Sequence, residues 1–197
     1  MIPENEIISR PHQSISFTKG EIIFKEGDLA RYYYQIVSGS VKMFNLGDDG
    51  KEFVQGIFKA QQSFGEPPLF GGFDYPASAM SLENTHLYRI LKNDFFKILK
   101  AFPETHLKFT KTLSNRLFYK SLILKEVAVQ SPKHRILTLL KYLKNKSENK
   151  DNEPYTIPHT RKQIAELANL RVETVIRIIK ELEKEGTLLI VERKVIL

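Results

Sequence analysis

The chain contains no cysteine, and none of its apolar runs approaches the length of a membrane span, about 20 residues. Without cysteine it cannot form disulfides, thiolate metal sites or cysteine-ligated iron–sulfur clusters. The first residues also lack the charged and apolar regions of a secretory signal peptide. We therefore expect a cytoplasmic protein that does not enter a membrane, and we exclude the sensors that bind an iron–sulfur cluster through cysteine.

Positive charge is in excess and is concentrated toward the C-terminus. The 197 residues include 30 Lys or Arg against 23 Asp or Glu, and residues 130–197 hold 14 of the former against 9 of the latter. A cationic region suits a polyanion, because phosphate contacts release counterions and supply most of the non-specific affinity for nucleic acids. The alternative interpretation of this charge is a lysine-rich solubilising surface.

Residues 158–184 show the pattern of two short helices around a tight turn. Thr160 and Gln163 form a capping box, Thr-x-x-Gln, at the start of the first helix. Asn169 follows that helix and tolerates the left-handed conformation that a sharp turn needs. The second helix is expected over about 172–184, with an apolar row formed by Val175, Ile178, Ile179 and Leu182. A short helix, a turn and a second helix with one free face form the layout that reads a DNA major groove.

Short strands with glycine-centred turns dominate residues 15–91. Apolar and polar residues alternate around Lys19-Gly20 and again through Ser38-Gly39. The pair Asp49-Gly50 lies between two strand-like runs and indicates a hairpin, because both central residues of that turn favour positive φ. Many short strands of this kind predict an all-β barrel or roll.

The pattern becomes helical after residue 91. A short helix is expected over 95–101, capped by Asn93 or Asp94, and a long one over 104–129, which lacks glycine and proline. Ser131-Pro132 places proline at the first position of a new helix behind a serine cap, so we expect the boundary between domains at Gln130-Ser131.

Two shorter features complete the C-terminal part. The helix that begins at Pro132 should end near residue 146, and the polar residues 144–152 predict a loop. Residues 187–191 and 194–197 look like a β-hairpin wing beside the helix pair.

The long helix carries two apolar rows, which imply two different partners. One row, with Phe109, Leu113 and Leu122, could face the β-domain. The other is a narrow stripe of leucines with small residues between them, which we expect to pack against a second copy of the chain. This stripe consists of Leu107, Ser114, Leu117, Ser121, Leu124 and Ala128. The alternative is a helix buried wholly in its own domain.

Three separated motifs, in this order, resemble the Crp/Fnr family of transcription regulators. They are residues 19–28 with 34–42, residues 64–70 with 76–79, and residues 160–177. The resemblance covers about residues 15–197 and implies an α+β chain with a cyclic-nucleotide-binding-type β-roll, a long dimerisation helix and a winged helix-turn-helix. We expect an effector-binding domain over 1–102, the dimerisation helix over 103–130 and the DNA-binding domain over 131–197.

The second motif matches the family's phosphate-binding cassette, here residues 64–79. In the family a Gly-Glu turn presents backbone amides to a cyclic phosphate, the Glu accepts from the ribose 2′-hydroxyl, and an Arg ten positions later pairs with the phosphate. Gly65 and Glu66 match, but Pro76 stands at the Arg position, followed by Ala77 and Ser78. Losing that charge-assisted bond should weaken nucleotide binding by about ten- to 150-fold.

Several alternatives for the effector stay open. Arg89 or Lys92 could replace the missing cation if the fold brings one of them into the pocket. Lys120 and Ser121 lie on the part of the long helix that, in relatives, reaches the base of the bound nucleotide. Gly65, Glu66 and Pro76 could equally be turn residues that preserve the fold in a roll with another effector or with none. Haem needs an axial ligand, for which His12, His86 and His106 are scattered candidates. No histidines are paired at the spacing of metal ligands, so the alternative is a surface or structural role.

At the DNA end, the family's two base-reading positions hold Glu173 and Arg177. A carboxylate accepts from cytosine N4, and a guanidinium donates to guanine O6 and N7. Their i, i+4 spacing also permits an ion pair in the free protein. Val172 and Ile176 lie beside them among the expected base-reading residues. The residues assigned to phosphates are Thr160, Arg161, Lys162, Arg171, Thr174 and Lys180.

We therefore expect a dimeric transcription regulator that binds double-stranded DNA at an inverted repeat, contacts RNA polymerase and responds to an unidentified effector. The chain shows no paired-carboxylate, nucleophile–base, metal-ligand or phosphate-loop constellation at workable spacing, so we do not expect an enzyme. The alternative function is a cyclic-nucleotide-binding signalling module that acts mainly through protein contacts.

Overall fold

The computed structural model describes residues 1–48, 50, 52–145, 147 and 154–197, with side chains except at 123 and 126–129. It divides into two compact units, Met1–Arg116 and Leu117–Leu197. Among the described residues, no helix is both long and apolar enough to cross a membrane.

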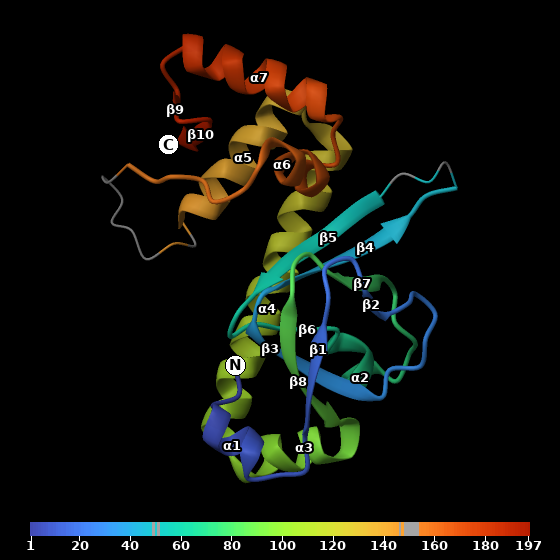
Figure 1. Cartoon of the computed structure of the whole chain (residues 1–197). Helices are drawn as coiled ribbons and strands as arrows, with labels where there is room; N and C mark the ends of the chain where they lie inside the picture. The colour runs from blue at the N-terminus through green and yellow to red at the C-terminus, as the bar shows by residue number, and fades with distance from the viewer. Residues whose placement is uncertain (49, 51, 146, 148–153) are drawn as a thin grey trace. The chain divides into compact units, whose positions relative to one another are not determined.

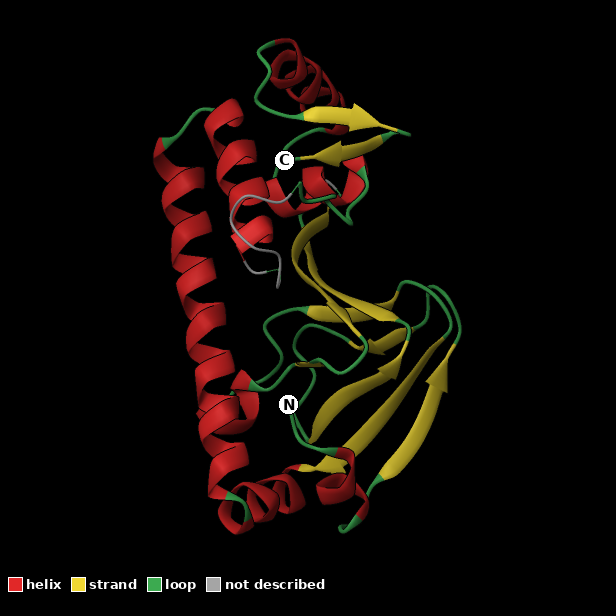
Figure 2. Ribbon diagram, turned by 90° about the vertical axis from the view of Figure 1, so that its left-hand side faces the viewer, coloured by secondary structure: helices red, strands yellow, loops and turns green. Residues whose placement is uncertain are grey.

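The first unit is a β-roll of two four-stranded sheets, ordered β1-β8-β3-β6 and β2-β7-β4-β5, in which all paired neighbours are antiparallel (Figures 1 and 2). The strands are β1 Gln13–Phe17, β2 Ile22–Phe24, β3 Tyr32–Ser38, β4 Ser40–Leu46, β5 Glu52–Lys59, β6 Ser63–Phe64, β7 Ser78–Ser81 and β8 Thr85–Leu91. The predicted roll is therefore confirmed.

Two of its turns show why the sequence folds this way. Gly39, between β3 and β4, has a φ of +87°, and a Cβ there would lie 2.5 Å from Thr85 Oγ1, so only glycine fits. The β4–β5 hairpin forms as the sequence predicts, with Gly50 at a φ of +73° and its N–H donated to the Gly47 carbonyl at 2.8 Å. Asp49, the other residue of the predicted turn, lies outside the described residues.

Helices of the first unit add residues to the core of the roll. They are α1 Glu4–Ile8, α2 Pro67–Gly71, α3 Lys92–Ala101 and the beginning of α4 Pro103–Val129. Ile7, Phe95, Ile98 and Phe109 are at most 1% exposed and join the same hydrophobic cluster as the strands. The expected cap of α3 is wrong: the helix begins at Lys92, its N-cap is Leu91, and Asp94 in its first turn pairs with Lys97 at 2.8 Å.

The second unit holds a helix pair, a supporting helix and a wing. Its elements after α4 are α5 Pro132–Asn145, α6 Arg161–Ala168, α7 Val172–Lys184, β9 Leu189–Val191 and β10 Lys194–Ile196. Ser131 caps α5 by accepting from the His134 N–H at 3.3 Å, and β9 and β10 pair as the expected hairpin. Of the expected loop over 144–152, residues 144 and 145 belong to α5, and residues 146 and 148–152 lie outside the described residues.

Candidate effector site and nucleic-acid interface

The cassette in the first unit has the turn that the sequence predicts. Gly65 has a φ of +73°, and a Cβ on it would lie 3.0 Å from the Phe24 ring and 3.2 Å from the Tyr75 ring. Glu66 follows as the N-cap residue of α2 and is only 1% exposed. The turn therefore delivers a carboxylate into the interior, where an ionised group needs a partner.

That partner is Arg116, from α4. Its Nη1 donates to both carboxylate oxygens of Glu66, at 3.0 and 2.9 Å, and its Nη2 donates to the Ser63 carbonyl at 2.7 Å. The Ser63 hydroxyl also donates to Glu66, and the guanidinium lies 5.1 Å from the centroid of the Phe58 ring. The carboxylate that would accept a ribose hydroxyl in a nucleotide site is thus already bonded to groups of its own chain.

Sequence reasoning missed Arg116, although a signal was present. Phe109 and Leu113 form the helix row that packs on the roll, and Arg116 continues that row at the spacing of three and four residues. An arginine in a row otherwise buried against a β-domain indicates a buried acidic partner there.

Residues 76–78, where the family resemblance places the phosphate-pairing arginine and its neighbours, make hydrogen bonds with neutral groups. Pro76 is exposed, and its carbonyl accepts from Asn45 Nδ2 at 2.7 Å, while Asn45 Oδ1 accepts from Gln55 Nε2 at 2.7 Å. Ala77 is fully buried, and the Ser78 hydroxyl accepts from the Glu26 N–H at 3.0 Å. This stretch is bound into the β-structure by neutral hydrogen bonds.

The structure shows other contacts for the two cations considered as replacements for the phosphate-pairing arginine. Arg89 donates from Nε to Gln13 at 2.9 Å, and its guanidinium lies 4.4 Å from the centroid of the Tyr32 ring. Lys92 is the first residue of α3, and its backbone N–H donates to the Arg31 carbonyl. Among the described residues, the cation that pairs with Glu66 is Arg116.

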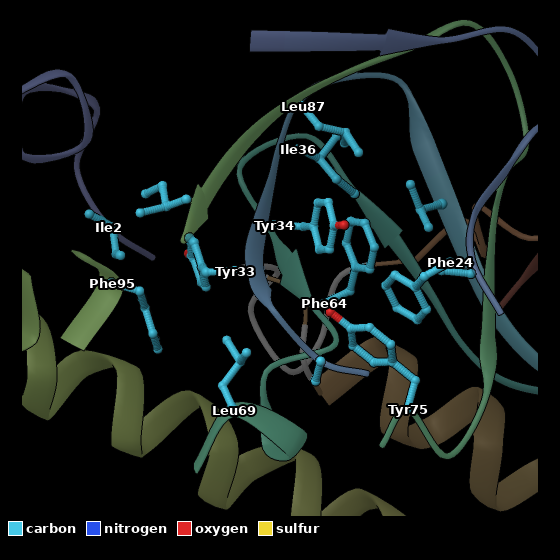
Figure 3. Close-up of a cluster of buried hydrophobic side chains, with 14 of the residues drawn as sticks. Ile2, Phe24, Tyr33, Tyr34, Ile36, Phe64, Leu69, Tyr75, Leu87 and Phe95 are labelled. Carbon is cyan, nitrogen blue, oxygen red and sulfur yellow. The ribbon is translucent and has the colours of Figure 1, made fainter. Parts of the chain in front are cut away.

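Aromatic rings fill the interior beside the cassette turn (Figure 3). The Phe24 and Tyr75 rings stack with centroids 3.7 Å apart, and Tyr34 stacks on Phe64 at 5.4 Å. Burial raises the pKa values of Tyr33, Tyr34 and Tyr75, because the phenolate is costly to desolvate. These rings make the interior beside the cassette turn apolar.

The remaining effector candidates are spread over the chain. Lys120 and Ser121 belong to the second unit, so their predicted contact with the effector stays a prediction. His12 packs edge-on against Tyr88, and the His86 ring nitrogens lie 2.7 and 3.0 Å from two serine hydroxyls of β1. His106 lies in α4, and among the described residues no three His, Cys, Asp or Glu side chains gather into a metal site.

In the second unit the predicted helix-turn-helix is present in detail. Thr160 and Gln163 form the capping box, with backbone-to-side-chain distances of 3.2 and 2.9 Å. Asn169 ends α6 in the left-handed region at a φ of 51°. Arg171, the N-cap residue of α7, makes no side-chain cap bond, which agrees with its replacement of the usual hydroxyl residue.

Helix α7 has one buried and one exposed face. Its buried row is the one that the sequence predicts, Val175, Ile178, Ile179 and Leu182, each at most 2% exposed. Glu173, Ile176 and Arg177 are exposed, as are Lys180 and Arg171, whereas Val172 and Thr174 are half-buried. The predicted base-reading residues therefore share an accessible face, with Val172 contributing less surface than expected.

The phosphate candidates differ in accessibility. Lys162 is 78% exposed at its side chain and lies 3.9 Å from Glu166, while Thr160 is exposed at the start of α6. Arg161 is half-buried, and burial lowers its pKa. Lys162 is consequently the cation of α6 that is best placed to meet a phosphate.

Arg177 has an ion-pair partner that differs from the one considered from sequence. Its Nη1 lies 3.7 Å from Glu181 Oε2, one turn further along α7. Within the described residues, the alternative pair between Glu173 and Arg177 is not formed. The two side chains predicted to read bases, Glu173 and Arg177, are therefore not paired with each other.

The stripe on α4 is exposed where a partner helix is expected. Leu107, Leu117 and Leu124 are 66%, 66% and 70% exposed. The Ser114 and Ser121 hydroxyls donate to carbonyls of their own helix, each at 3.0 Å, so they present only their carbon atoms and a satisfied oxygen. The side chain of Ala128 lies outside the described residues.

Two family models match the chain, one described as a cyclic nucleotide-binding domain over residues 14–102 and the other as a Crp-like helix-turn-helix domain over residues 134–197. The chain is similar to the cyclic AMP receptor protein of Thermus thermophilus, at 28% identity over 171 residues that span 86% of this chain and 76% of the relative. It is also similar to the transcriptional activator protein anr of Pseudomonas aeruginosa, at 24% identity over 173 residues that span 85% and 69% of the two chains.

Solved structures share the fold over almost the whole chain. FixK2 from Bradyrhizobium japonicum superposes with a TM-score of 0.76 at 21% identity, covering 95% of this chain and 93% of that one. The regulator CLP from Xanthomonas campestris gives a TM-score of 0.75 at 22% identity, with coverages of 98% and 96%.

Proposed function

The chain belongs to the Crp/Fnr family of transcription regulators, and from that premise we propose that it binds an inverted-repeat DNA operator as a homodimer. The observation that carries the proposal is the exposed face of α7, where Glu173 and Arg177 stand opposite the buried row. The turn before α7 orients that face, since the capping box and Asn169 determine where α6 begins and ends.

In the proposed complex, α7 lies in the major groove. Arg177 donates to guanine O6 and N7, and Glu173 accepts from cytosine N4, so each half-site contains a G·C pair within a TGA-like core. Ile176 and Val172 contact neighbouring base edges. Lys162, Thr160, Arg161, Arg171, Thr174 and Lys180 position the protein on phosphates without reading sequence.

A homodimer through α4 supplies the symmetry of the operator. Two copies of the exposed leucine stripe bury each other, and the small Ser114 and Ser121 allow close approach of the helices. Two recognition helices related by the dimer axis then enter successive major grooves, about 34 Å apart. The proposal includes contact with RNA polymerase and a cytoplasmic location, and it includes no enzymatic activity.

We also propose that cyclic nucleotides bind weakly or not at all. Arg116 and Ser63 already satisfy Glu66, and the Pro76 carbonyl accepts from the neutral side chain of Asn45. A nucleotide would have to displace the Arg116 contact and would find no arginine at position 76. Calorimetry with cyclic AMP tests this, and low-micromolar affinity contradicts it.

Site selection from random DNA tests the central proposal. We expect an inverted repeat with one G·C pair in each half whose preference is relaxed by Arg177→Ala, at a cost of roughly 1–3 kcal/mol. Lys162→Ala is the matched control, because it should weaken binding to all sequences alike and flatten the salt dependence. Enrichment of a non-palindromic motif, or of one without that G·C pair, contradicts the roles proposed for Glu173 and Arg177. No enrichment at all favours a signalling module that acts through protein contacts.

A further inference from the structure

Glu181 lies between two cations in the second unit. Its Oε2 is 3.7 Å from Arg177 Nη1, and its Oε1 accepts from Lys133 Nζ at 2.9 Å. Lys133, in the first turn of α5, also donates to Glu185 at 2.5 Å. One carboxylate oxygen of Glu181 therefore contacts Arg177 of α7, and the other contacts Lys133 of α5.

Lys133 also binds this carboxylate, from α5. The hydrogen bond from Lys133 lowers the pKa of Glu181, in the direction that favours the charged form. Because Lys133 comes from another helix, it restrains the Glu181 side chain more than a contact within α7 alone could. Arg177 remains 70% exposed at its side chain, so DNA can reach it and compete for it.

Resting on the proposed base-reading role of Arg177, we propose that Glu181 is a positioning residue that holds Arg177 in the free protein and competes with guanine for its guanidinium. Only a complex with the correct base pair requires Arg177 to leave Glu181. On other sequences the pair can persist while lysines and arginines contact the phosphates. Glu181 thus lowers the ratio of the affinity for the operator to the affinity for DNA that lacks the G·C pair. Its negative charge can also repel phosphates, which weakens binding to both DNAs equally.

The expected effect is small and measurable. Exposed ion pairs one helix turn apart are weak, so breaking this one should change an equilibrium constant by about two- to fivefold. When Arg177 moves to the base, the Lys133 bond still compensates the charge of Glu181. The cost of separating Arg177 from Glu181 therefore stays within this two- to fivefold range.

The experiment compares two duplexes in the full-length chain: the selected operator and the same operator with the G·C pair assigned to Arg177 replaced by A·T. Glu181→Gln should raise the ratio of the two affinities about two- to fivefold. In an Arg177→Ala background the same substitution should leave that ratio unchanged. Circular dichroism of each variant reports its folding.

Glu185→Gln is the matched control. It removes an equal charge one turn further on and touches the same Lys133, but only Glu181 forms an ion pair with Arg177 among the described residues. It should therefore tighten binding to both duplexes by the same factor and leave the ratio of the two affinities unchanged.

The outcomes separate the inference from the function on which it rests. An equal gain on both duplexes for Glu181→Gln, or an effect that persists without Arg177, is a plain charge effect and overturns the inference while the DNA-reading proposal stands. A wild-type chain that selects no operator overturns both.

Discussion

Replacing Arg116 by methionine removes the guanidinium that compensates Glu66 and keeps most of the apolar stem. Glu66 is 1% exposed, and the Arg116 side chain is 25% exposed. Removing one partner of a buried ion pair costs about 3–5 kcal/mol, because an uncompensated charge remains inside. Since Arg116 is partly solvated and Ser63 still donates to Glu66, we expect a loss near the lower end, about 3 kcal/mol.

Urea unfolding followed by near-ultraviolet circular dichroism measures this loss, because the roll's packed tyrosine and phenylalanine rings supply the signal. Glu66→Gln is the second single variant, and a neutral amide in place of the carboxylate should cost less, about 1–2 kcal/mol. The double variant should recover much of the stability lost in Arg116→Met, since no buried charge remains. A loss below 1 kcal/mol for Arg116→Met, or a double variant no more stable than Arg116→Met, would refute the assignment of Arg116 as the partner that Glu66 requires.

Three further expectations concern stability. Asn169→Ala should destabilise the second unit by about 1–2 kcal/mol because φ is 51° there, whereas Asn169→Gly should not; thermal unfolding compares them. Leu182→Ala should cost about 2–5 kcal/mol, as its side chain is 0% exposed, and a smaller loss in urea would show that the site collapses around the cavity. The raised pKa values of Tyr33, Tyr34 and Tyr75 contribute stability that is complete below about pH 10 and is lost as the pH rises toward the folded values. Tyrosinate absorbance should therefore include these three only as the roll unfolds, and full titration of all 8 tyrosines before unfolding would contradict this.

Features that depend on neighbours in the chain were predictable from sequence. The capping box joins Thr160 to Gln163 across three residues, and the left-handed Asn169 needs only its own short side chain. The buried row of α7 and the exposed stripe of α4 follow from helical periodicity, which also locates the predicted face with Glu173 and Arg177. In each case the interacting atoms lie within one or two turns.

The partners of the charged groups were decided by the tertiary structure. Glu66 and Arg116 are 50 positions apart, and the pairing depends on which face of α4 packs on the roll. The start of α3 also differs from expectation: the helix begins at Lys92, whose N–H donates to the distant Arg31 carbonyl, so Asn93 and Asp94 lie inside its first turn.

Arg177 shows the physical reason most clearly. Carboxylates lie four residues before and after it, and the helix rule favours Glu173, because an acidic residue N-terminal to a cation is the better orientation. The structure selects Glu181, which Lys133 holds from 48 positions away. Periodicity determines which side chains share a face, but a long charged side chain can reach several partners on it. Only the fold, by bringing a distant third charge to one of them, decides which pair forms.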